Sequence, residues 1–266
     1  MLKLYRSIEL VYLMLRIGFI RAKLYWKNLV LYAISRLALL FLLITFWNAL
    51  VRSFRIEALG LNELSISAII GFYYLVWGII SLVWGIKRLG DYITYAKLDT
   101  FIIRPINLSM LLILYNIHGG CFIQIIFGLS MFVYVVALLH PSLLCIALSL
   151  GLAFEGVLLY VLIQAFIGLL TVALVKSEYV SELVDWFYEY SYVPVTYMVS
   201  SVREVLTFGI PVAFIAILPG LSLTKIISVK YSIHLLILGL FLASAWYIAY
   251  RIALAKVMSK YESALG

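Results

Sequence analysis

Long apolar runs dominate the sequence and limit the folds it can adopt. Six windows are long enough, or nearly so, to cross a bilayer as a helix: 34–51, 65–86, 108–139, 143–175, 202–218 and 231–254. A helix rises about 1.5 Å per residue, so about 20 apolar residues cross roughly 30 Å of hydrocarbon. Only 12% of the residues are charged, whereas a soluble domain has about 25%. We therefore predict an all-α polytopic membrane protein, a single transmembrane domain over 1–266 with about six spans within 34–254.

The fifth window differs from the other five because it contains prolines. Pro211 lies inside the window and Pro219 directly follows its end. Proline removes a backbone donor and kinks or ends a helix. We expect this segment to be bent or to cross the membrane only in part.

Residues 1–33 are too charged for a span and have an amphipathic pattern. In a helical projection the charged side chains from Lys3 to Lys27 fall on one side, and the opposite side carries apolar residues and Trp26. This pattern predicts an N-terminal helix lying in the membrane interface. A frayed basic tail is the alternative. We expect residues 255–266 to form a C-terminal cytoplasmic tail.

The distribution of basic residues predicts the orientation. With six spans and both termini in the cytoplasm, 15 of the 20 Lys and Arg residues fall on the inner side of the membrane. Cytoplasmic loops are enriched in Lys and Arg. We therefore predict a multi-pass plasma (cytoplasmic or inner) membrane protein whose net charge of +8 favours anionic lipid rather than nucleic acid as a partner.

A second amphipathic stretch follows the fourth window and carries four aligned carboxylates. Glu178, Glu182, Asp185 and Glu189 have the spacing i, i+4, i+7, i+11, which places them on one stripe of a helix. Two interpretations remain open: a solvated face on an interface helix, or a surface that docks a basic partner.

Few polar residues lie inside the predicted spans, and these are the pathway candidates. They are His118 and Gln124 in the third window, and Glu155 and Gln164 in the fourth. A carboxylate within the bilayer is costly, so Glu155 is a functional candidate. The alternative for Glu155 is a group that only ties helices together, and a lone histidine such as His118 is more often a packing residue.

The sequence lacks the motifs of several enzyme classes. It has no G-x-x-x-x-G-K-[ST] phosphate loop, no H-E-x-x-H and no G-x-S-x-G. The three histidines are scattered without a metal-ligand spacing. We therefore predict no catalytic residue, metal or cofactor in this chain. A secondary transporter, a channel and a non-transporting scaffold remain alternatives at this point.

Three stretches resemble the ABC-2-type permeases, most closely the six-span group described as ABC-2 family transporter proteins. The stretch "YAKLDTFIIRPIN" between the second and third windows resembles their cytoplasmic loop, with Leu98, Asp99, Arg104, Pro105 and Asn107 at the matching places. The stretches "LTFGIPVAFIAILPG" (206–220) and "KYESALG" (260–266) resemble their fifth span and their C-terminal end. Ala96, Leu108 and Leu265 depart from the usual residues of the group.

This resemblance implies a function in which the energy comes from outside the chain. It implies a permease subunit that pairs with a second permease, identical or paralogous, and with separate ATP-binding subunits that hold ATP and Mg. The expected activity is export of an amphipathic or hydrophobic substrate. We expect 91–104 to form a short helix that contacts the ATP-binding subunit and couples it to the spans. A polar turn that merely joins two spans is the alternative.

Overall fold

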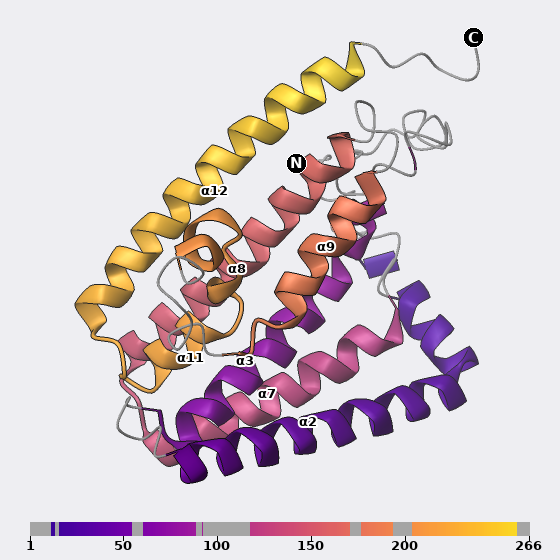
Figure 1. The fold of residues 1–266 in the computed structure, drawn as a ribbon. Coiled ribbons are helices and arrows are strands. Elements are labelled where there is room, and N and C mark those ends of the chain that lie inside the picture. The colour runs from indigo at the N-terminus through magenta and orange to yellow at the C-terminus, as the bar shows by residue number, and fades with distance from the viewer. Residues whose placement is uncertain are drawn as a thin grey trace.

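The structure is a computed structural model, and it describes residues 12–13, 16–54, 61–88, 92, 118–170, 177–193 and 204–259. The residues matched to the cytoplasmic loop of the family, from Leu98 to Asn107, lie outside these described residues. The described part of the chain is helical and contains no strand (Figure 1). The prediction of an all-α polytopic membrane protein is confirmed.

Among the residues that the structure describes, five helices are long and apolar enough to cross a membrane. They are α2 (Trp26–Phe54), α3 (Glu63–Leu82), α7 (Gly119–Leu139), α8 (Leu143–Leu170) and α12 (Val229–Met258). One end of each helix lies at the same end of the bundle, at the lower left of Figure 1. These ends are Phe54 of α2, Glu63 of α3, Leu139 of α7, Leu143 of α8 and Val229 of α12. The opposite ends of α2, α3, α7, α8 and α12 therefore share the other side.

The helix that contains the first predicted window begins before that window. Residues 16–24 are helical, and α2 starts at Trp26 rather than at residue 34. The long stem of Lys27 can lie along apolar surface while its ammonium reaches the interface, so one early cation does not stop the span. The helix thus continues through residue 33, and the boundary between an interface helix and the first span at that residue stays a prediction. As a result Arg36 lies well inside α2.

The fifth predicted window is not one continuous helix in the described residues. It forms a π-helix, η4 (Val205–Gly209), a 3₁₀ turn, η5 (Val212–Phe214), and then the short helix α11 (Ile217–Leu223). Pro211 forces the break, because the residue before a proline avoids the α region, and Ile210 is extended. This break agrees with the expectation that the segment is bent or crosses the membrane only in part.

This broken segment is buried among other helices. Residues 212–217 are each at most 2% exposed, and α11 contacts α3 and α8. Irregular backbone is tolerated at membrane depth only where protein or water covers it. The surrounding helices thus supply the cover that the broken segment needs.

The helix α3 is the centre of the bundle, and glycines allow its closest contact. Its span is 89% buried, against 11% for α2 and 22% for α12. A Cβ placed on Gly128 of α7 would lie 2.3 Å from the backbone N of Leu75 in α3. A Cβ on Gly78 of α3 would lie 2.7 Å from the backbone N of Ile125. Small residues let membrane helices approach this closely, so these two glycines set the α3–α7 contact.

An ion pair joins the end of α2 to the start of α3. The Arg52 guanidinium binds the Glu63 carboxylate at 2.5 Å (Nη2–Oε1), and both side chains are largely exposed. Asn62 caps α3, because its side chain accepts the backbone N–H of Ser65. This pair lies at the opposite end of α3 from the candidate site described below.

Candidate functional site

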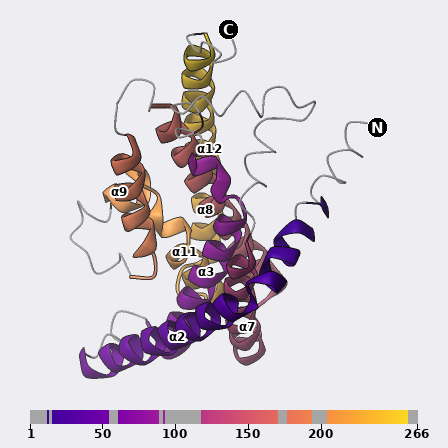
Figure 2. The same ribbon diagram turned by 90° about the vertical axis from the view of Figure 1, so that its right-hand side faces the viewer.

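Helix α9 (Ser177–Glu189) packs along α8 at the edge of the bundle (Figures 1 and 2). Its buried side chains, Ser181, Val184, Asp185 and Tyr188, follow the i, i+3, i+4, i+7 spacing of one helical face. Ser181 contacts Gln164 and Asp185 contacts Tyr160, so α9 runs antiparallel to α8. The face of α9 that meets the protein is therefore partly polar.

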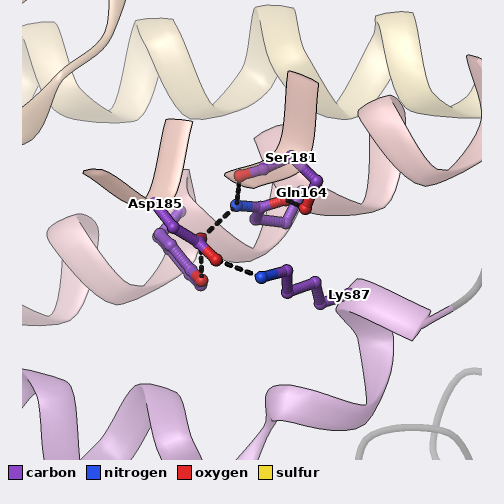
Figure 3. Close-up of polar contacts among 5 residues, drawn as sticks. Lys87, Gln164, Ser181 and Asp185 are labelled. Atoms are coloured by element: carbon purple, nitrogen blue, oxygen red, sulfur yellow. Dashed lines mark hydrogen bonds and ion pairs between the residues drawn. The ribbon is translucent and has the colours of Figure 1, made fainter. Parts of the chain in front are cut away.

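Asp185 is the centre of a polar cluster, which we call the α9 cluster: Lys87, Tyr160, Gln164, Ser181 and Asp185 (Figure 3). One carboxylate oxygen of Asp185 pairs with the Lys87 ammonium. The other accepts hydrogen bonds from Tyr160 Oη at 2.7 Å and from Gln164 Nε2 at 2.6 Å. Ser181 Oγ donates to Gln164 Oε1 at 2.8 Å. Each of the five side chains thus has a hydrogen-bond or ion-pair partner within the cluster, as a stable buried polar network requires.

The α9 cluster joins three parts of the chain that are distant in sequence. Lys87 belongs to η2 (Trp84–Arg88), the 3₁₀ turn that follows α3. Tyr160 and Gln164 belong to α8, and Ser181 and Asp185 belong to α9. Lys87 also lies over the Trp84 ring, 4.8 Å from its centroid. The cluster therefore fixes the end of α3 to both α8 and α9.

The predicted acidic stripe is only partly exposed. Glu182 and Glu189 are exposed, whereas Asp185 is 6% exposed and bound inside the α9 cluster; the side chain of Glu178 is outside the described set. The expectation that Asp185 shares a solvated or docking face is therefore wrong. A counter-ion and two hydrogen-bond donors offset the cost of burying this carboxylate.

A cleft lies beside the α9 cluster, between α2, α3 and α7. We call it the α2–α3 cleft. Its volume is about 280 Å³, and its aromatic lining residues are Tyr32 of α2, Tyr73, Tyr74 and Trp77 of α3, and Trp84 of η2. The Trp77 ring contacts the Trp84 ring at a centroid distance of 6.2 Å. These rings give the cleft a mainly apolar wall.

The polar lining of the α2–α3 cleft comes from four elements. It consists of Arg36, Ser81, His118, Gln124 and Glu189. Gln124 Nε2 donates to Tyr32 Oη at 2.5 Å, and the Arg36 guanidinium lies 5.0 Å from the Tyr32 ring centroid. Burial lowers the pKa of the His118 imidazole, so this side chain is neutral at pH 7. Arg36 and Glu189 are thus the charged groups of the described lining.

The structure brings five of the seven predicted site residues whose side chains it describes to these two places. Gln164 and Asp185 meet in the α9 cluster, and His118, Gln124 and Glu189 line the α2–α3 cleft. Lys87 and Arg36 were counted in the sequence only as topological charges. Arg36 is the third residue of the predicted 34–51 window, where a cation near the end of a span is expected to reach the interface.

Glu155 lies apart from both places, at the contact between α8 and α12. It is 3% exposed, and its Oε2 accepts no hydrogen bond from the residues that the structure describes. A Cβ placed on Gly239 would lie 2.0 Å from Oε2, so the carboxyl group packs against this glycine of α12. Phe214 of the broken segment lies against the same glycine. The function of Glu155 in transport stays a prediction.

Replacing Glu155 with methionine should distinguish its two interpretations. A buried polar atom without a partner costs about 1–3 kcal/mol, so Glu155→Met is expected to raise the unfolding temperature in detergent. Glu155→Gln, which keeps a polar amide there, should remain close to the parent. A residue that only tied α8 to α12 by hydrogen bonds would give the opposite result, a lower unfolding temperature for Glu155→Met.

The described residues contain no group of three His, Cys, Asp or Glu side chains that could hold a metal ion. In that same part of the chain Cys121 and Cys145 are buried free thiols. The described side chains of both sites offer charge pairing, hydrogen bonding and aromatic contacts. Such groups can bind and orient a molecule, and they can transmit movement between helices.

Comparison with known proteins gives one clear match. The family model described as "ABC-2 family transporter protein" matches residues 59–264, which is most of the 266-residue chain. No curated protein and no solved structure matches it. The matched range includes α3, α7, α8, α9 and α12, and so all of the α9 cluster.

Proposed function

Because the chain belongs to the ABC-2 transporter family, we propose that it is the permease subunit of an ATP-driven transporter. In this proposal separate subunits bind ATP and Mg and supply the energy. A second permease, identical or paralogous, completes the pathway, and the substrate is an amphipathic or hydrophobic molecule that is exported. The absence of a phosphate loop from the sequence supports an external source of energy.

One observation supports coupling to a partner subunit most directly. Lys87 lies two residues before the 89–117 segment, which contains the stretch that resembles the family's cytoplasmic loop. Through the Asp185 carboxylate it is bound to α9 and, by Tyr160 and Gln164, to α8. Movement of the loop would therefore act on α8 and α9 through an ion pair rather than through α3 alone. A force applied to the loop would thus be transmitted to α8 and α9 in the membrane domain.

The orientation follows from the same scheme. The ends of α3, α8 and α12 that lie with the α9 cluster would face the cytoplasm, together with both termini, in a plasma membrane. Lys87, Arg251 and Lys256 lie near those ends, as expected for cytoplasmic cations. ATP-binding subunits would then meet Leu98, Asp99, Arg104, Pro105 and Asn107 of the loop.

Reversing the two loop charges tests this proposal. With its ATP-binding partner in proteoliposomes, the variant carrying Asp99→Lys and Arg104→Glu should insert and form a complex, yet lose substrate-stimulated ATP hydrolysis. The reason is that each reversed charge would oppose its partner charge in the ATP-binding subunit.

The matched control exchanges a pair of charges at the other end of the spans. Arg52→Glu with Glu63→Arg restores an exposed ion pair in reversed order, and it should leave ATP hydrolysis unchanged. Normal stimulation in the loop variant would contradict the proposal and would leave 97–110 as a simple connector.

A further inference from the structure

Arg36 is a cation inside a membrane span without a carboxylate partner in the described chain. It lies ten residues after Trp26, the start of α2, which is about 15 Å along the helix and within a candidate membrane span. The described residues form ion pairs only at Arg52–Glu63 and Lys87–Asp185. A charge at this depth is costly, and it normally faces a cavity or a counter-ion. Arg36 faces the α2–α3 cleft.

Two other polar atoms of the cleft residues also lack partners. Gln124 is 6% exposed and Trp77 is 7% exposed. Gln124 Oε1 and Trp77 Nε1 make no hydrogen bond to any residue that the structure describes. Most buried polar groups in native proteins are paired. One acceptor and one donor of residues that line the cleft are thus unpaired in the described chain, on residues that also lie beside the Arg36 cation.

From this arrangement we propose that the α2–α3 cleft binds an amphipathic anion. Arg36 pairs with a phosphate or carboxylate group, Gln124 and Trp77 bind polar atoms next to it, and the rings of Tyr73 and Tyr74 contact the apolar part. The inference rests on the proposed function, because it names the substrate class of that permease. The volume of about 280 Å³ is just below the range of drug-sized ligands, so the cleft holds the head of a longer molecule.

The charges of the cleft favour an anion over a cation. The Arg36 guanidinium already lies over the Tyr32 ring, and the Lys87 ammonium already lies over the Trp84 ring. These two rings are therefore not open to a ligand cation. Glu189 is exposed, and solvent and salt screen its charge. The guanidinium of Arg36 is half-buried and is screened less.

Dodecyl phosphate is a suitable probe, measured by isothermal titration against the purified chain in dodecyl maltoside. The parent protein should bind it saturably. Arg36→Gln should bind at least tenfold more weakly, whereas Arg36→Lys, which keeps the charge, should remain within a few-fold of the parent. Arg52→Gln is the matched control, because it removes an arginine from the far end of the same helix, and its affinity should be unchanged.

Two comparisons on the parent protein alone keep the test independent of any variant's folding. Dodecyltrimethylammonium, with the same chain and the opposite charge, should not compete, and neither should inorganic phosphate at the same concentration. Equal binding of the cationic probe, equal binding of inorganic phosphate, or an unchanged affinity in a folded Arg36→Gln protein would each overturn the inference. No ATP-binding subunit takes part, so failure of the proposed function would leave this result standing, and the reverse also holds.

Discussion

Replacing Asp185 with leucine is expected to destabilise the protein by about 3–5 kcal/mol, the usual cost of removing one partner from a buried ion pair. Lys87 has a side-chain exposure of 19% and Asp185 one of 9%, so water replaces the lost partner poorly. Tyr160 and Gln164 would also lose their acceptor. The measurement is equilibrium unfolding in mixed detergent micelles.

The control for Asp185 is a carboxylate on the same helix. Glu182 is exposed, so Glu182→Leu should change the free energy of unfolding by no more than about 0.5 kcal/mol. Similar costs for Asp185→Leu and Glu182→Leu would contradict the description of a buried, satisfied pair.

A double variant separates stability from coupling. Lys87→Met with Asp185→Leu removes both charges, and replacing a buried ion pair by apolar groups is often neutral or stabilising. We expect this variant to recover the part of the loss that comes from the unpaired Lys87 ammonium, whereas the cost at Tyr160 and Gln164 remains. It should not recover ATP hydrolysis stimulated through the loop, because the link from η2 to α9 is gone.

Replacing Gly128 with alanine is expected to have the second largest effect, a loss of about 3 kcal/mol or more. Its Cβ would lie 2.3 Å from the backbone N of Leu75, and a backbone atom cannot move aside as the end of a side chain can. Overpacking usually costs about 1–3 kcal/mol, and α7 would have to separate from the central helix α3. Unfolding in mixed micelles measures this cost as well.

Gly151 provides the matched substitution for Gly128. It is also a helical glycine, but its Cβ would meet only the Leu236 side chain, whose Cδ2 lies 3.2 Å away, and a small rotation of that side chain can relieve the contact. Gly151→Ala should therefore cost less than about 1 kcal/mol, and the higher helix propensity of alanine offsets part of that. Equal losses at both glycines would show that the α3–α7 approach is not the cause.

The spans could be predicted from the sequence because apolar length alone determines whether a helix can cross a bilayer. The 231–254 window, for example, lies inside α12. The start of α2 lies before the predicted window because Lys27 belongs to the charged pattern of residues 1–33, although a long basic side chain can be accommodated within a span. The prolines predicted the break at Pro211, but which helices cover the broken segment depends on tertiary packing that no local pattern contains.

The orientation of α9 shows a second limit of sequence reasoning. Spacing correctly placed Asp185 on a stripe with other carboxylates, and the rule for soluble helices then put that stripe outward. In the structure Asp185 faces the protein, whereas Leu183, Trp186 and Phe187 are exposed. The deciding partner, Lys87, is 98 residues away in the sequence. Beside a bilayer the outer surroundings are apolar, so buried polar groups can pair inside the protein.

The resemblance to ABC-2 permeases was found from three short stretches, and the family match over 59–264 confirms it. The cleft could not be predicted, because Arg36, Trp77 and Gln124 belong to three different helices. Each of these residues has an ordinary explanation when taken alone. Only their packing brings an unpaired cation, a donor and an acceptor to one cavity.

Purification of the affinity-tagged chain from its native membranes, in mild detergent and at low salt, tests the central claim most directly. We expect an ATP-binding chain to co-purify in about equal amount, recognised by a G-x-x-x-x-G-K-[ST] sequence, and the complex to hydrolyse ATP. A tagged membrane protein of unrelated family from the same cells is the control. Recovery of the chain as a folded species with no ATP-binding chain above that control would contradict the account.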